Sequence, residues 1–157
     1  MSSPHIVALT ALALLLGAVV CDLRDRTIPD WISVALLALG AAATGLDWHP
    51  VGWGSLAGGA GVAFGLGAAL FYLGAIGGGD AKLCAGLGAI CGWPRVFEAL
   101  FATALCGGVL SFVAQRRGAE SLPYAPAIAA GYAVTITVAW TAPPSAGLWS
   151  LITGATL

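Results

Sequence analysis

Two aspartates stand out in this chain of 157 residues because each lies at the edge of a long apolar stretch. Asp22 directly follows the apolar run that ends at Cys21, and Asp80 follows three glycines in the segment GGGDAKL. A carboxylate in such a place is costly unless it is paired or hydrated, so it is a candidate for function. Two carboxyl groups held close together share a proton, since both cannot be ionised cheaply. One can then act as base on a water while the other protonates a carbonyl, as in aspartic proteases.

The same two residues can also be ordinary helix caps at a membrane interface, and their positions alone do not decide between the two interpretations. Asp30 has a simpler explanation, because it follows Pro29 and precedes an apolar stretch, which is a good N-cap position. Asp25 lies between two arginines and can pair with either of them.

The composition of the chain indicates a membrane protein. Hydrophobic residues make up 59% of the sequence and charged residues only 8%, whereas soluble domains carry about 25% charged residues. The net charge of −1 gives no indication of a nucleic-acid partner. Since no basic residue precedes the first apolar run, we interpret that run as a retained spanning helix and not as a signal peptide.

We therefore expect an all-α polytopic membrane protein, a single domain with six transmembrane helices. The expected helices cover about residues 4–21, 31–46, 54–76, 81–92, 96–115 and 127–142. The second, fourth and sixth are shorter than the roughly 20 residues of a full span, so they should extend into flanking segments or lie in a thinned region. The apolar tail 148–157 is too short to span.

The basic residues predict the orientation of these helices. With six spans, five of the six basic residues fall on one side of the membrane, and only Arg95 falls on the other. The five are Arg24, Arg26, Lys82, Arg116 and Arg117. That side is then cytoplasmic, and both termini lie outside the cytoplasm. The six tryptophans agree, since all lie near expected helix ends, where an aromatic belt forms.

Small residues and cysteines suggest packing and not chemistry. The glycine pairs 54/58, 61/65 and 88/92 have the spacing that brings membrane helices close together. The four cysteines form no CxxC pair and are expected to act as small buried apolar residues. His5 and His49 lie far apart in the sequence, so we expect no metal site and no cofactor.

Three short motifs resemble those of the type IV prepilin peptidases, the GxGD class of intramembrane aspartic proteases. GGGDAKL resembles the signature G-x-G-D-x-K-L, and DLRDRTIPD resembles a motif in which an aspartate is followed some seven residues later by I/L-P-N/D. PYAPAIAAG, residues 123–131, resembles the P-F-G-P-F-x-A-x-G stretch that opens the last helix of the family. The three motifs occur in the family's order.

The resemblance implies a catalytic pair, Asp22 and Asp80, with Gly77 and Gly79 as the motif glycines and Pro29, Asp30 and Lys82 as further motif or substrate-binding residues. It implies removal of a short basic leader from a prepilin or pseudopilin at the cytoplasmic face of the inner membrane, with the substrate's apolar helix in the bilayer. Lys82 can alternatively be a lysine that only helps to set the orientation of the chain.

Full-length members of that family carry a cytoplasmic segment with paired CxxC motifs and a methyltransferase activity, and this sequence shows no CxxC. It is therefore most similar to the short forms found with Tad-type (Flp) pili or to the preflagellin peptidases, and we expect no methylation. One alternative is a small transporter or pilus-assembly scaffold whose acids are caps or an ion site. Another is a presenilin-like protease, although those are longer and carry their first aspartate in a Y-D motif.

Overall fold

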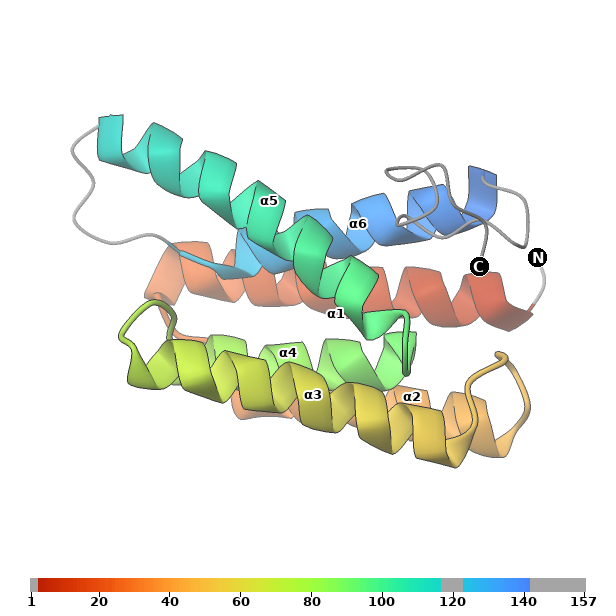
Figure 1. Ribbon diagram of the computed structural model, residues 1–157. Coiled ribbons are helices and arrows are strands. Elements are labelled where there is room, and N and C mark those ends of the chain that lie inside the picture. The colour runs from red at the N-terminus through yellow and green to blue at the C-terminus, as the bar shows by residue number, and fades with distance from the viewer. Residues whose placement is uncertain (1–2, 117–122, 142–157) are drawn as a thin grey trace.

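The computed structural model describes residues 3–116 and 123–141. The regular secondary structure in this part of the chain is all helical, without strands. Six helices are connected by short loops (Figure 1). They are α1 (Ser3–Asp25), α2 (Asp30–Gly45), α3 (Trp53–Tyr72), α4 (Gly78–Cys91), α5 (Val96–Arg116) and α6 (Ala125–Thr141). The expected all-α fold is confirmed. Arg117, Trp149 and the tail 148–157 lie outside the described residues.

Consecutive helices run in opposite directions and form two groups of three (Figure 1). In one group α4 packs against both α2 and α3, and in the other α6 packs against both α1 and α5. The two groups meet chiefly where α1 packs on α2, with smaller contacts from α4. As a result, the end of α1 and the start of α4 come to the same end of the bundle.

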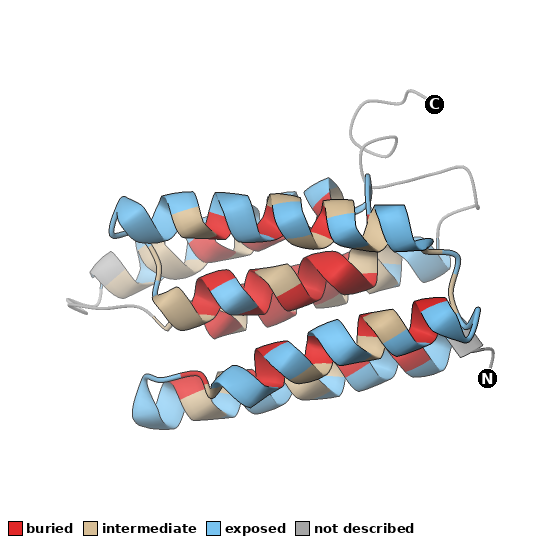
Figure 2. Ribbon diagram, turned by 90° about the horizontal axis from the view of Figure 1, so that it is seen from below, coloured by how far each residue is buried: buried red, intermediate tan, exposed pale blue. Residues whose placement is uncertain are grey.

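The helix α4 is the most buried of the six, and buried positions dominate its ribbon (Figure 2). Leu83 and Leu87 on this helix are completely enclosed, as are Leu15 of α1, Leu36 of α2 and Ile128 of α6. Each such leucine or isoleucine contributes about 1.5–3 kcal/mol when it leaves water. α4 therefore holds a fixed position, which matters because Asp80 lies in its first turn.

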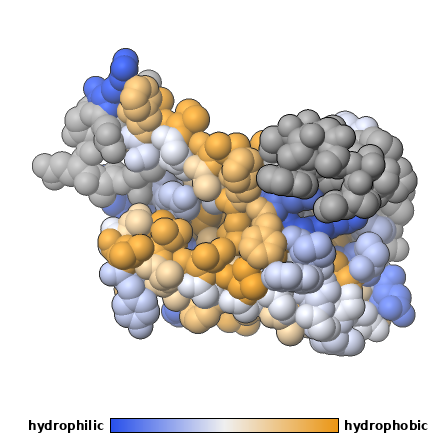
Figure 3. Space-filling view, viewed as in Figure 1, coloured by the Kyte–Doolittle hydropathy of each residue, from blue (hydrophilic) through white to orange (hydrophobic). Residues whose placement is uncertain are grey.

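The outer surface is apolar along the middle of the bundle, as expected for helices that face lipid. Large apolar side chains of α3 and α5 gather on one face (Figure 3). Three helices are long and apolar enough to cross a membrane, namely α1 from Pro4, α3, and α5 to Ala114. α2, α4 and α6 have 16, 14 and 17 residues. The number of spans and the orientation of the chain stay predictions.

Two helix ends differ from the sequence-based boundaries in ways that affect the candidate site. α1 continues to Asp25 instead of ending at residue 21, so Asp22 lies inside its last turn and not after it. α3 ends at Tyr72 instead of residue 76, because Gly74 adopts a left-handed conformation with φ of 72°. Its amide bonds back to the carbonyl of Phe71, which closes the helix and lets the chain turn toward α4.

The glycine pairs contribute to packing at one place and not at the others. A Cβ on Gly59 of α3 would overlap the carbonyl oxygen of Gly88 in α4, and a Cβ on Gly88 would overlap that of Gly59. Gly54, Gly61 and Gly65 have no neighbour within 4 Å of such an atom. The prediction of close helix packing was correct for the pair Gly88 and Gly92, which contacts Gly59 of α3. It was wrong for the pair Gly61 and Gly65.

We predict that Gly59→Ala destabilises the protein by about 1–3 kcal/mol, because the added methyl forces α3 away from α4. Gly61→Ala, two residues along the same helix, is the matched control and should leave stability unchanged or slightly raised. Thermal unfolding of the purified proteins, followed by tryptophan fluorescence, measures both. Equal unfolding temperatures in the two variants would contradict the packing described for α3 and α4.

Candidate active site

Asp22 is held inside the protein by the start of the last helix. Its side chain is 7% exposed, and its Oδ2 accepts a hydrogen bond of 3.1 Å from the backbone amide of Ala125. Ala125 is the first residue of α6, and the amides at a helix start carry partial positive charge. The hydrogen bond and the dipole of α6 together hold the carboxyl group of Asp22 at the start of this helix.

Asp80 lies in a different environment at the start of α4. It is also 7% exposed, and its Oδ2 accepts a hydrogen bond of 3.0 Å from the backbone amide of Gly77, which precedes the helix. The second oxygen, Oδ1, is buried and has no hydrogen-bond partner within the described part of the chain. One half of this carboxyl group therefore fixes the helix start, and the other half is left to bind a proton, a water or a substrate.

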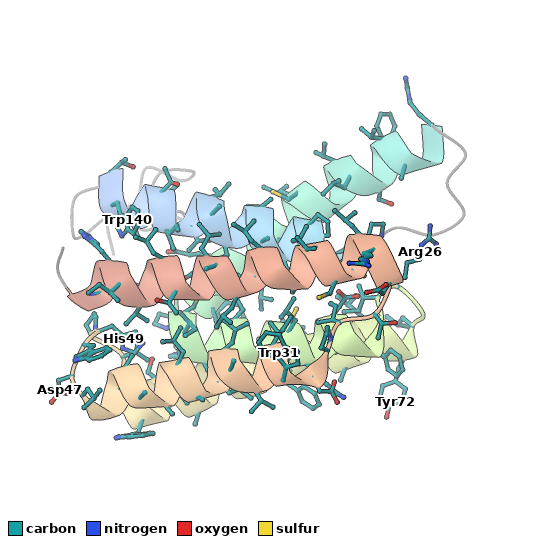
Figure 4. The ribbon with its side chains drawn as sticks, turned by 180° about the vertical axis from the view of Figure 1, so that it is seen from behind. Arg26, Trp31, Asp47, His49, Tyr72 and Trp140 are labelled. Atoms are coloured by element: carbon teal, nitrogen blue, oxygen red, sulfur yellow. The ribbon has the colours of Figure 1, made fainter. Side chains whose placement is uncertain are left out.

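The two carboxyl groups line one pocket of about 280 Å³ between the two groups of helices. The other walls are the segment between α1 and α2, which includes Arg26, Thr27 and Ile28, and the glycines that open α4. Figure 4 shows Arg26 at this end of the bundle. Residues 58 positions apart in the sequence thus meet in a pocket with room for several water molecules or an extended peptide segment.

The environment of Asp80, including the charge of Asp22, raises the pKa of Asp80. Asp80 precedes the fourth expected span and lies outside the three candidate spans. Burial raises its pKa from 3.8 to about 6; the Gly77 amide partly offsets this, and the negative charge of Asp22 raises the pKa further. Asp80 therefore holds its proton under mildly acidic conditions in which an exposed aspartate is ionised. A carboxyl group that keeps its proton in this way can act as a general acid.

Comparisons with known proteins identify the family of the chain. Residues 9–112 match the model of the type IV leader peptidase family. This range includes both Asp22 and Asp80. The chain belongs to this family.

The chain is 35% identical over 132 residues to the prepilin leader peptidase/N-methyltransferase of Bacillus subtilis, covering 79% of this chain and 52% of that protein. It is 42% identical over 65 residues to the protein of the same name from Burkholderia pseudomallei, covering 39% of this chain and 21% of that protein. The chain thus spans about half the length or less of these curated relatives. No solved structure matches the chain.

The glycines of the leader peptidase motif have separate roles in this structure. A Cβ on Gly79 would lie 3.2 Å from the Cβ of Ile28, so a side chain there would push the start of α4 away from the segment between α1 and α2. A Cβ on Gly77 would lie 3.1 Å from Oδ2 of Asp80 and would crowd the carboxyl group. Glycine at these positions lets α4 begin close to the wall of the pocket.

Lys82 does not line the pocket of the two aspartates. Its Nζ lies 2.8 Å from both carboxylate oxygens of Asp30, and the two side chains are 51% and 68% exposed. The prediction that Asp30 caps α2 was wrong by one residue. Pro29 occupies the N-cap position and Asp30 is the first helical residue, so its carboxylate is turned toward Lys82. Asp30 still borders the pocket, so this ion pair lies at the edge of the site.

Sequence reasoning missed the role of Ala125. A backbone amide leaves no mark on residue type, and the only available signal was the third motif, residues 123–131, which begins at this turn. Tyr124 covers Gly107 of α5, where a Cβ would lie 2.7 Å from the tyrosine oxygen. The motif therefore places the start of α6 against both α5 and Asp22.

Within the described residues, no three or more His, Cys, Asp or Glu side chains come together in a way that could hold a metal ion. Besides Asp22 and Asp80, the polar side chains that line this pocket are those of Arg26, Thr27 and Asp30.

We predict that Asp80→Asn raises the thermal stability above pH 6 and that the gain shrinks toward pH 4. The raised pKa means that the folded state gives up this proton less readily than the unfolded state. The contribution of Asp80 to the free energy of unfolding is therefore highest below pH 3.8. It is lost as the pH rises through about 6, by about 2–3 kcal/mol. Asparagine removes that charge and can still accept the Gly77 hydrogen bond.

The control is Asp25→Asn, at an exposed position one turn after Asp22. Its effect on the unfolding temperature should be small at both pH values. A gain for Asp80→Asn that is independent of pH would show that charge burial is not its cause.

Proposed function

We propose that this protein is an intramembrane aspartic endopeptidase that removes the leader peptide from a prepilin or pseudopilin. The observation that carries the proposal is the single pocket in which Asp22 and Asp80 face a common volume from opposite helix groups, each held by a backbone amide. Membership of the type IV leader peptidase family and the names of the curated relatives support the choice of substrate.

The environments of the two carboxyls suggest their roles in peptide hydrolysis. Asp22, held by the first amide of α6, takes a proton from a water in the pocket. Asp80, protonated on the oxygen that Gly77 does not bind, donates to the carbonyl oxygen of the scissile bond as that water attacks. When the tetrahedral intermediate breaks down, the proton on Asp22 passes to the leaving amine, and Asp80 takes back a proton from a hydroxyl of the intermediate as the new carboxyl group forms.

The charges around the pocket are consistent with a basic leader. Asp25 and Asp30 are exposed near the pocket and can attract such a segment, whereas Lys82 would repel it and is neutralised by Asp30. Arg24, Arg26, Lys82 and Arg116 all lie at this end of the helices, so we place the site at the cytoplasmic face of the inner membrane. That the substrate is of the Flp/Tad type is proposed from the sequence motifs alone.

A transporter or a scaffold is a less economical interpretation. A scaffold has no need for two buried carboxyls in one pocket, one of which lacks a hydrogen-bond partner for an oxygen atom. An ion pathway would need charged groups along the bundle, whereas among the described residues the buried polar side chains other than the two aspartates are hydroxyl-bearing ones, namely Ser33, Thr44, Thr103 and Thr135.

We predict that Asp22→Asn and Asp80→Asn each reduce cleavage by roughly a thousandfold or more, because the mechanism needs both an ionised and a protonated carboxyl. The assay is co-expression with a candidate Flp-type prepilin, with loss of the leader followed as a shift on a gel. Asp25→Asn is the control, since this exposed residue does not line the pocket. Full cleavage by either of the first two variants, present in the membrane at normal amounts, would rule out the mechanism.

We predict a smaller effect for Lys82→Met. An exposed ion pair is worth about 1 kcal/mol or less, so breaking the contact with Asp30 should reduce the cleavage rate by about tenfold or less. If the pair acts as a unit, Asp30→Asn should have a similar effect, and the double variant should be no worse than the more affected single variant. Complete loss of cleavage in a correctly inserted Lys82→Met protein would instead make Lys82 part of the catalytic machinery.

A further inference from the structure

A second cavity, of about 130 Å³ and open to the surface, lies at the end of the bundle opposite the two aspartates. It is bounded by the start of α1, the segment between α2 and α3, the ends of α4 and α6, and the turn before α5. Figure 4 shows two of its residues, His49 and Trp140, at the end opposite Arg26. Nothing in the proposed peptidase mechanism uses this cavity.

The ring of His49 carries two polar atoms that need partners. Both Nδ1 and Nε2 are buried, and neither has a hydrogen-bond partner within the described part of the chain. Leaving a buried polar atom unpaired is costly, so such atoms are normally satisfied by protein, water or ligand. A neutral imidazole offers one N–H donor and one acceptor nitrogen. A partner that satisfies both must therefore present an acceptor and a donor.

Arg95 supplies a charge at the same cavity. Its side chain is exposed, and no carboxylate of the described residues lies within ion-pair distance of it. One guanidinium matches the single negative charge of a phosphodiester and can bind two of its oxygens. The acidic residues of this end, Asp47 and Glu98, disfavour a second negative charge on the ligand and can accept hydrogen bonds from an amine or a hydroxyl.

The position of the cavity indicates where such a ligand would come from. Four exposed tryptophans lie at this end of the helices, at the level where aromatic residues meet lipid headgroups. They are Trp48, Trp53, Trp93 and Trp140. Apolar side chains such as Ile6 of α1 and Val134 of α6 are exposed on the helices that form the cavity and can pack against acyl chains. The size of the cavity suits the end of a headgroup, with the phosphate near Arg95 at its mouth.

We propose that this cavity binds a phospholipid headgroup that combines a phosphodiester with a hydrogen-bond donor, as in phosphatidylethanolamine or phosphatidylglycerol. Arg95 binds the phosphate, and His49 donates to an oxygen of the headgroup and accepts from its amine or hydroxyl. Phosphatidylcholine has the phosphate but lacks the donor, so it leaves the acceptor nitrogen of His49 unpaired. The inference is independent of the proposed peptidase activity.

The test is lipid binding to the purified full-length chain, measured by native mass spectrometry with three lipids of identical acyl chains. The wild type should bind phosphatidylethanolamine and phosphatidylglycerol roughly fivefold more tightly than phosphatidylcholine, the factor that one hydrogen bond contributes. His49→Phe should abolish this preference, and His49→Gln should keep part of it, because an amide also offers a donor and an acceptor. His5→Phe is the matched control, because a phenyl ring can keep the edge-to-face contact of His5 with Trp140, whose ring centroids lie 4.9 Å apart.

Arg95→Gln provides a second variant at an exposed position where folding is not at risk. It should weaken the binding of all three lipids by similar factors, because all carry the phosphodiester. Equal binding of the three lipids by the wild type, or an unchanged preference in His49→Phe, would overturn the proposal. Soluble glycerophosphoethanolamine carries the same headgroup without acyl chains, so it separates a lipid from a free solute as the source of the headgroup. Binding as tight as that of phosphatidylethanolamine would assign the cavity to a free solute.

Discussion

The structure depends on the burial of two carboxyl groups where two groups of three helices meet. Asp22 comes from one group and Asp80 from the other, and each is only 7% exposed. Buried carboxyls of like charge repel each other and lose hydration, so they persist only where the protein supplies hydrogen bonds or lets one carboxyl keep its proton. The first amide of α6 and the amide before α4 supply those bonds. The starts of α4 and α6 therefore both lie at the pocket.

The helices that carry the aspartates are held by ordinary packing. α4 is enclosed by apolar side chains of α2 and α3 and approaches α3 so closely that Gly59 and Gly88 leave no room for a Cβ. α6 is fixed at its start by Tyr124 against Gly107 and by the contact of Gly131 with Thr103. A rigid α4 and a fixed α6 define the pocket from two sides, while the segment around Arg26 and Ile28 closes a third side.

The all-α fold, and which two aspartates share a pocket, could be predicted from the sequence because both depend on strong local signals. Long apolar stretches with Pro/Gly breaks specify the helices, and an isolated carboxylate after GGG is conspicuous in such a chain. The role of Ala125 could not be predicted, because a backbone amide is the same in every residue other than proline. The partner of Lys82 was also out of reach, because Asp30 lies 52 residues away and their meeting depends on how α2 packs on α4. The glycine spacing indicated close packing but not which pairs face another helix.

The central claim is that Asp22 and Asp80 are coupled through the pocket they share, and the most direct measurement is the pKa of Asp80 with and without the charge of Asp22. Infrared titration of the protonated carboxyl band in the purified protein gives this value, with Asp80→Asn used to assign the band. The account predicts a pKa near 6 in the wild type and a lower pKa in Asp22→Asn, although still above that of an exposed aspartate because burial persists. A pKa of Asp80 that does not change when Asp22 loses its charge would contradict the account.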